Sequence, residues 1–220
     1  FSKKFISILI IMFLLFFIVK LIEYFYYGHD IIPTIEEFNY IPNLLFLYFL
    51  FYSSDIVLGL YHETAHVVAA RYYGIQNINI NIGRRLIHLV YQTQIPNTWS
   101  VSKKGRRIMY LSGMIADCFL ITLITIIGHF FLLQGFIVLY YIMRIITLTL
   151  LLGILFELKL YMRTDIYYLI SDSLELPNLH QDSVKLLKNI KNWFGASKQL
   201  RTYTLIMLLS STIEIIIFLK

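Results

Sequence analysis

Long apolar stretches separated by polar loops dominate the chain. Runs of about 20 apolar residues, the length that spans the hydrocarbon core of a bilayer, occur several times. They predict five helical spans, near residues 5–27, 43–73, 108–133, 136–158 and 201–219. We therefore expect an all-α polytopic membrane protein that forms one integral membrane domain over residues 1–220 and has the lipid bilayer as its surroundings.

One polar loop carries a different pattern. Residues 77–82 alternate strictly between Asn and Ile, and residues 86–95 continue as a β-prone stretch. A period of two is typical of strands, so we predict a small β-hairpin or sheet on the cytoplasmic face. One interpretation is a sheet that only caps the helices. The other is an exposed edge that pairs with an extended peptide through backbone hydrogen bonds, and the two are compatible.

Composition agrees with a membrane protein and excludes other classes. Of 220 residues, 58% are hydrophobic and 15% are charged, which is more apolar surface than a soluble domain of this size can bury. The lone Cys118 excludes a disulfide framework. The net charge of +6 lies in loops beside apolar segments, where it indicates topology rather than nucleic-acid binding.

The distribution of charge predicts an orientation. Residues 23–42 contain four acidic residues and no Lys or Arg, whereas the loops after the second and fourth spans are basic. By the positive-inside rule, the N-terminus and both basic loops are expected in the cytoplasm. The first stretch follows Lys3 and Lys4 but lacks a small-residue cleavage site, so we predict a retained span rather than a signal peptide. The start at Phe1 without Met is expected of a processed or partial chain.

A metal-binding motif lies near the cytoplasmic end of the second span. His62 and His66 are four residues apart, which places both imidazoles on one helical face where they can bind one zinc ion. Glu63 lies beside the metal and can act as a general base. A chance match is the alternative, but two histidines and a glutamate in an apolar helix are costly unless they are functional.

A catalytic zinc ion requires a third protein ligand. The candidates outside the second span are Asp117, Glu157, Asp165, Asp172, His180 and Asp182. The fourth span returns toward the cytoplasm just before Asp165, which places this carboxylate on the same side as His66. We therefore predict one Zn²⁺ per chain, bound by His62, His66 and Asp165.

Several motifs in order resemble the site-2 protease family of intramembrane zinc metalloproteases. They are His62-Glu63-x-x-His66, Ala70-Arg71-Tyr72-Tyr73-Gly74, Ser112-Gly113, Asp165-x-Tyr167-Tyr168-x-x-x-Asp172 and Pro177-Asn178-Leu179, within roughly residues 50–190. The similarity is greatest to the bacterial peptide zinc metalloprotease branch encoded with modified-peptide maturation systems. It implies a three-helix core within a catalytic region of about residues 43–190, zinc ligation by His62, His66 and Asp165, Glu63 as general base, and a bacterial cell membrane.

The chain departs from that family at two positions, and other polar residues allow more than one interpretation. Ile166 stands where the family often has Gly, and Asp117 stands where many members have Asn. Three interpretations of Asp117 stay open. Its carboxyl group is protonated because it is buried, it faces a cation such as Arg144, or the family role of this position is lost. Asp55 is expected to pair with Arg144 or a serine, with catalysis as the alternative. Arg163 has three possible roles: it orients Asp165, it binds the substrate backbone, or it is only one of the basic residues of a cytoplasmic loop. Asp172 is a further candidate for supporting the site or binding substrate.

These features predict an intramembrane zinc metalloendopeptidase. It is expected to hydrolyse a peptide bond near the cytoplasmic face in a membrane-inserted or membrane-associated polypeptide, such as a ribosomally made precursor peptide. A non-proteolytic immunity or export accessory protein for a small peptide is the alternative, against which the intact Glu63 argues. A transporter or channel would instead spread polar groups at mid-depth over several spans.

Overall fold

The computed structural model describes residues 3–29, 32–41, 43–85 and 88–218. Its helices are α1 (Lys3–Tyr27), α2 (Leu44–Tyr72), α3 (Lys103–Leu133), α4 (Ile137–Glu157), α5 (Asp165–Leu174), α6 (Leu179–Lys188) and α7 (Lys198–Phe218), and its strands are β1 (Asn79–Arg85) and β2 (His88–Gln94). Short 3₁₀ turns η1 (Ile35–Tyr40), η2 (Thr98–Ser100), η3 (Leu160–Met162) and η4 (Ile190–Asn192) connect them. Phe1, residues 86–87 of the predicted second strand and residue 219 of the predicted last span lie outside the described residues.

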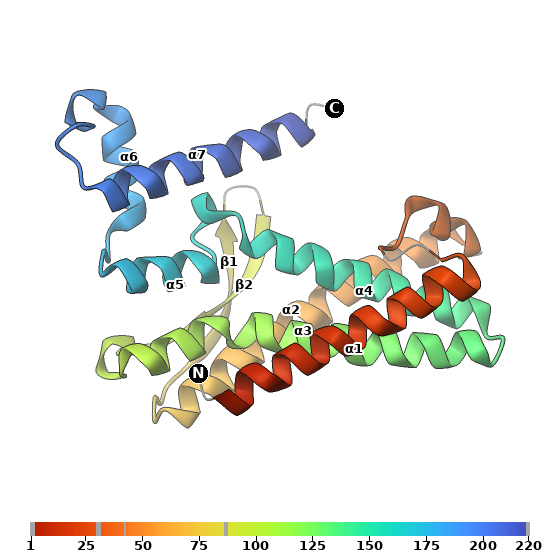
Figure 1. Cartoon of the computed structure of the whole chain (residues 1–220). Helices are drawn as coiled ribbons and strands as arrows, with labels where there is room; N and C mark the ends of the chain where they lie inside the picture. Colours follow the sequence, from red (N-terminus) through yellow and green to blue (C-terminus); the bar gives the residue numbers. More distant parts are fainter. Residues whose placement is uncertain (1–2, 30–31, 42, 86–87, 219–220) are drawn as a thin grey trace.

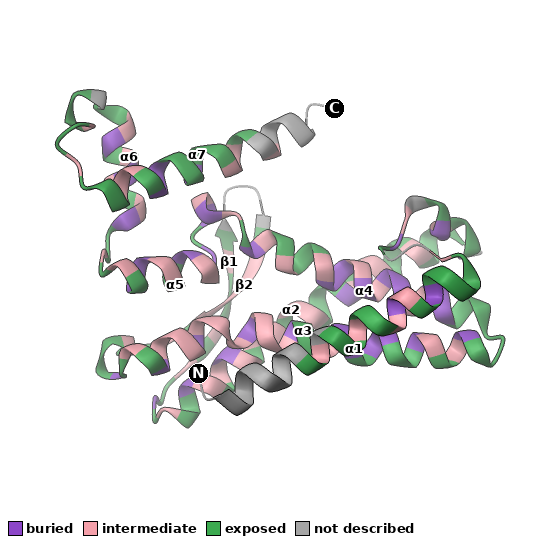
Figure 2. Ribbon diagram, viewed as in Figure 1, coloured by how far each residue is buried: buried purple, intermediate pink, exposed green. Residues whose placement is uncertain are grey.

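The burial pattern of α2 is the reverse of that in a water-soluble protein. Its buried residues are Ser54, His66 and Ala70, whereas the large apolar side chains of Leu44 and Phe49 are 81% and 66% exposed. Figure 2 shows exposed residues along the outer faces of the long helices. Apolar side chains facing outward and polar ones facing inward are expected where lipid surrounds the helices.

The helix α3 is the centre of the bundle. It contacts α1, α2, α4 and α5, and α2 and α4 both run antiparallel to it (Figure 1). Its buried residues recur about every four positions from Gly105 through Met109, Gly113 and Asp117 to Ile121. Small residues in such a stripe allow neighbouring helices to approach closely.

The predicted membrane class is confirmed at a coarse level. Three helices, α2, α3 and α4, are long and apolar enough to cross a membrane among the residues described. Each lies within a few residues of its predicted range. The predicted first and last spans fall on α1 and α7, and their crossing of a membrane stays a prediction.

The predicted hairpin is present, with shifted boundaries. The strands β1 and β2 pair antiparallel, with Ile80 opposite Thr93 and Gly83 opposite Val90. The first strand begins at Asn79 rather than Asn77, because Asn77 has a left-handed backbone with φ of 59°. The strand β2 contacts α2, which places the hairpin beside the His62-Glu63-x-x-His66 turn.

The helices after α4 form a smaller cluster at one end of the bundle (Figure 1). Leu160, Tyr167, Leu179, Tyr203 and Met207 form its buried core. The helix α7 packs against α6 and η3, and Nζ of Lys159, two residues beyond α4, lies 2.6 Å from Oε1 of Glu214 near the end of α7.

A buried ion cluster joins α1, η1 and α4 far from the hairpin. The Arg144 guanidinium pairs with the carboxylates of Glu37 and Glu23, and Nζ of Lys20 lies 2.8 Å from Glu23. Tyr140 donates a hydrogen bond to Glu23 at 3.1 Å. Buried charges in a membrane bundle are tolerated when they neutralise one another. Of the two partners expected for Asp55, Arg144 or a serine, Arg144 is therefore wrong, because its guanidinium pairs with Glu23 of α1 and Glu37 of η1.

Removing one partner of this cluster should destabilise the protein strongly. We expect Arg144→Met to cost about 3–5 kcal/mol of unfolding free energy, because it leaves buried carboxylates without their counter-charge. Adding Glu37→Gln should recover part of that loss, since the double variant retains the Lys20–Glu23 pair. Denaturation of the detergent-solubilised variants measures both effects, and additive losses in the double variant would contradict the ion-cluster interpretation.

Candidate metal centre

The helix α2 brings His62 and His66 onto one face. The two imidazole centroids lie 5.0 Å apart, as expected for residues separated by one helical turn. The spacing of the motif therefore produces the predicted pair of nitrogen donors.

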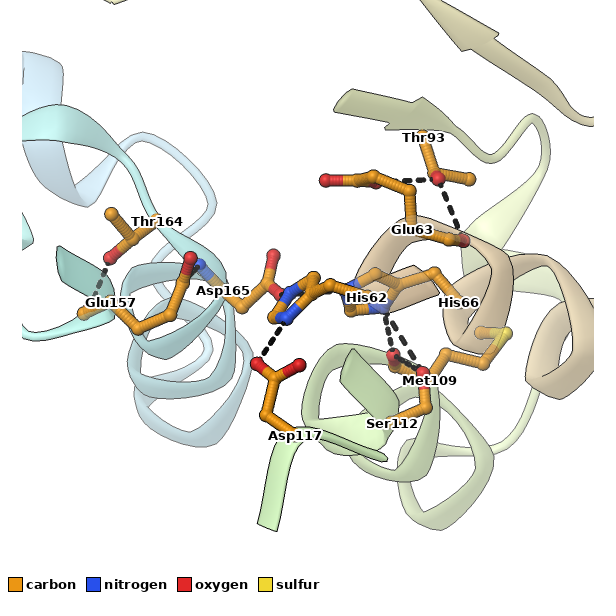
Figure 3. Close-up of polar contacts among 10 residues, drawn as sticks. All are labelled: His62, Glu63, His66, Thr93, Met109, Ser112, Asp117, Glu157, Thr164 and Asp165. Atoms are coloured by element: carbon orange, nitrogen blue, oxygen red, sulfur yellow. Dashed lines mark hydrogen bonds and ion pairs between the residues drawn. The ribbon is translucent and has the colours of Figure 1, made fainter. Parts of the chain in front are cut away.

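The predicted third donor joins them from a distant part of the chain. Oδ2 of Asp165 lies 2.7 Å from Nε2 of His66 and 3.2 Å from Nε2 of His62. The donor atoms of these three residues all lie within 4.8 Å of one another (Figure 3). Asp165 begins α5, where the positive end of the helix dipole favours a carboxylate.

The other nitrogen of each imidazole is held by α3. Nδ1 of His62 lies 2.6 Å from Oδ2 of Asp117, and Nδ1 of His66 lies 2.7 Å from the carbonyl oxygen of Met109. When each Nδ1–H donates to these acceptors, both Nε2 lone pairs face Asp165. Such partners fix the tautomer and orientation of metal-binding histidines.

The backbone at Asp165 is held by the end of α4. The amide N–H of Asp165 donates to Oε2 of Glu157 at 2.8 Å, and the Thr164 hydroxyl donates to the Glu157 carbonyl oxygen at 2.6 Å. Glu157, one of the predicted candidate ligands, instead positions the candidate ligand Asp165. Ile166, which stands where the resemblance leads one to expect Gly, continues the regular helix α5.

Asp165 is suited to act as an anionic ligand. Burial alone would raise the pKa of its carboxyl group, but the adjacent His66 and His62 side chains, in their protonated form, outweigh burial and hold this pKa below its usual range. The group is therefore ionised at neutral pH.

The three donors fit a zinc ion. Nε2 of His66 lies 2.7 Å from Oδ2 of Asp165, and when Nδ1–H of the same ring donates to Met109, this contact places a nitrogen lone pair against a carboxylate oxygen. Two largely buried acceptors that face each other require a cation between them. Two imidazole nitrogens with one carboxylate are a donor set that catalytic zinc uses, leaving a fourth position for water or substrate. A metal ion would satisfy Nε2 of both histidines and neutralise Asp165.

Glu63 lies beside these donors without joining them. Its Oε2 accepts a 2.6 Å hydrogen bond from the Thr93 hydroxyl of β2 (Figure 3). Glu63, His66 and Asp165 line one cleft of about 800 Å³, together with Thr93, Tyr110 and Tyr168. The carboxylate of Glu63 is therefore positioned to exchange protons with a molecule bound in this cleft.

The remaining candidate residues differ in whether they contact the three donor residues or the cleft. Asp117 contacts His62 rather than Arg144. Asp172 lines the cleft but pairs with Nε of Arg106 at 2.7 Å. Arg163 is exposed, with a left-handed backbone, and Asp55 is exposed on α2, so neither joins the metal centre.

Three contributing residues were not identified from the sequence. Thr93 lies in the predicted hairpin, but nothing in the strand pattern distinguishes it from other polar positions. Glu157 was considered only as a ligand. Gly113 appeared only as part of a motif, whereas a Cβ at this position would lie 2.2 Å from Nε2 of His62. The absence of a side chain at 113 is thus what admits the His62 ring.

No family model, curated protein or solved structure matches the chain significantly. The resemblance to site-2 proteases therefore stays a prediction, and function has to be argued from the site.

The glycine at 113 provides a direct test of the metal centre. Gly113→Ala should lower zinc affinity at least about 10-fold, because the new methyl group displaces His62 from its supporting contact. Gly153→Ala is the matched control, since a Cβ at 153 would meet no atom within 4 Å. Metal content after dialysis against graded chelator measures the effect, and equal retention by both variants would show that His62 is not a ligand.

The carboxylate of Asp117 should contribute through His62. We expect Asp117→Asn to weaken zinc binding about 10–100-fold, the usual effect of losing the hydrogen-bond partner of a metal-binding histidine. Asp55→Asn removes a carboxylate from the exposed face of α2 and should leave affinity unchanged. Competition with a zinc-responsive dye measures both, and equal affinities of the two variants would argue against this role.

Proposed function

We propose that the protein is an intramembrane zinc metalloendopeptidase. The observation that carries this proposal is the convergence of His62, His66 and Asp165 on one point with the carboxylate of Glu63 in the same cleft. Among intramembrane ionisable groups, such a constellation is functional by default.

The division of roles follows from the contacts. His62, His66 and Asp165 would hold the zinc ion, which when bound supplies Lewis acidity toward water and the substrate carbonyl. Glu63 would take a proton on its carboxylate from the attacking water and deliver it to the leaving amine. The Thr93 hydroxyl donates to Oε2 of Glu63 and so orients this carboxylate toward the cleft.

The cleft supports an extended peptide as substrate. It is lined on one side by hairpin residues, including Asn79, Gln92 and Thr93, whose polar groups can hydrogen-bond a peptide. A helical substrate hides its carbonyl groups in hydrogen bonds and would have to unwind before hydrolysis. We propose a membrane-inserted or membrane-associated polypeptide, such as a ribosomally made precursor, that enters beside β2 as an extended strand.

The charge distribution supports an orientation with the proposed metal centre toward the cytoplasm, in what the resemblance implies is a bacterial cell membrane. The basic residues Lys103, Lys104, Arg106 and Arg107 begin α3 at the end of the bundle that carries the metal centre. By the positive-inside rule this end faces the cytoplasm.

A non-proteolytic accessory protein for a small peptide is the alternative function. It would need the fold but not the proton-transfer group. The hydrogen bond from Thr93 to Glu63 favours the enzyme, since it holds the side chain at the cleft rather than in a structural ion pair.

Substitution of Glu63 separates these functions. Glu63→Gln should retain about one zinc per chain and reduce proteolysis about 10²–10⁴-fold, the usual contribution of a general base. His62→Ala should lose both metal and activity. Mass spectrometry of membrane peptides from cells that express each variant identifies the uncleaved substrate. If cells that express Glu63→Gln show the same biological effect as cells that express the wild type, the accessory function is favoured.

A further inference from the structure

A second cavity lies on another face of α2, outside the metal cleft. This α2–α3 groove has a volume of about 660 Å³ and is lined by residues from Tyr61 to Tyr72 on α2, by Tyr73 directly after that helix, and by residues from Lys104 to Ala116 on α3. It shares no lining residue with the metal cleft.

The surface of the groove is apolar. Ala65, Ala69 and Ala116 are among its small lining residues, and Val68 and Tyr72 beside them are 68% and 84% exposed. Such side chains gain free energy when an apolar partner covers them.

Three hydroxyl groups in the lining already have partners. Tyr61 donates to the Ala116 carbonyl oxygen at 3.3 Å, Thr64 donates to the Tyr61 carbonyl oxygen at 2.7 Å, and Ser112 donates to the Met109 carbonyl oxygen at 2.8 Å. These groups do not require hydrogen bonds from an occupant. The inner part of the groove therefore suits a hydrocarbon chain.

One end of the groove carries a positive charge. Lys103 pairs with Glu175 and Arg106 pairs with Asp172, whereas the ammonium group of Lys104 forms no ion pair with a described residue. Lys104 is exposed at the start of α3, at the basic end of the bundle. Among the lining residues it is the only charged one, so it can attract an anionic group.

The length of the groove matches one leaflet of a bilayer. Lys104 and Ala116 are 12 positions apart on α3, which corresponds to about 18 Å of helix. Half of the hydrocarbon core is about 15 Å thick. A lipid with its headgroup at Lys104 would therefore place its acyl chain along the groove as far as Ala116.

We propose that the α2–α3 groove binds an anionic phospholipid. The phosphate lies at Lys104, and one acyl chain packs along Ala69, Ala65 and Ala116. This site is independent of the proposed proteolysis. It would nevertheless adjoin the metal centre, because the hydroxyl of Ser112 lies 3.1 Å from Nδ1 of His66.

Lipid retention tests the headgroup part of the proposal. The full chain, purified in detergent, is mixed with equal amounts of phosphatidylglycerol and phosphatidylcholine that carry the same acyl chains, and retained lipid is counted by native mass spectrometry. The wild type should retain phosphatidylglycerol preferentially, and Lys104→Gln should reduce that preference about fivefold, the effect of one lysine at an anionic lipid surface. Lys198→Gln is the control, because Lys198 is an exposed lysine outside the groove. Equal preferences in the two variants would overturn the proposal.

Filling the groove tests the acyl-chain part. Ala65→Phe should reduce retention of both lipids to the level of non-specific adducts, whereas Lys104→Gln should reduce only the headgroup preference. The thermal unfolding midpoint shows whether Ala65→Phe is folded. If a folded Ala65→Phe variant retains lipid as the wild type does, the groove does not hold an acyl chain. If it does not fold, Val68→Ser, which removes only exposed apolar surface, should still weaken retention of both lipids, and unchanged retention would overturn the proposal.

Discussion

Gly113 lies where α3 passes the His62 ring of α2, and a Cβ at this position would lie 2.2 Å from Nε2 of that ring. The candidate metal centre depends on this close approach. The helices α2 and α3 run antiparallel, so the earlier histidine of α2 meets the later partner on α3. His62 contacts Asp117 and His66, four positions further along α2, contacts Met109, eight positions before Asp117, with Gly113 midway between these two partners. One face of α3 admits the imidazoles and orients both of them.

The bundle contains two buried polar clusters that differ in how far they are satisfied. Around Arg144, charges of both signs neutralise each other and join α1 and η1 to α4. In this first cluster two cations face two carboxylates, and Oε1 of Glu23, which makes no hydrogen bond, lies 3.5 Å from Nδ1 of His129. Around Asp165, two imidazoles face one carboxylate, with Nε2 of His66 at 2.7 Å from Oδ2. With both Nδ1–H groups donating to α3, the second cluster has acceptors facing acceptors and would be completed by a cation, which supports the functional proposal.

The sequence predicted the long helices and the hairpin because their signals are local. Apolar length predicted α2, α3 and α4, and a period of two predicted β1 and β2. Asp165 was also predictable, since the direction of the fourth span places the start of α5 near His66. The partners of Asp117 and Arg144 were not, because they depend on which helical faces meet. Arg144 contacts Glu23 and Glu37 only because α1 and η1 lie against α4, and no local pattern encodes that arrangement.

The two cavities beside α2 differ in the hydrogen bonds they offer. The metal cleft is bordered by the hairpin, and its Asn79, Gln92 and Thr93 present polar groups to which an unwound peptide can bond. In the α2–α3 groove, the hydroxyls of Tyr61, Thr64 and Ser112 donate to backbone carbonyl groups. An extended peptide placed there would leave much of its backbone unpaired, at a cost of several kcal/mol for each group in hydrocarbon. A hydrocarbon chain incurs no such cost. Backbone hydrogen bonding would therefore favour a peptide in the cleft and a lipid in the groove, so that α2 would separate the two proposed occupants.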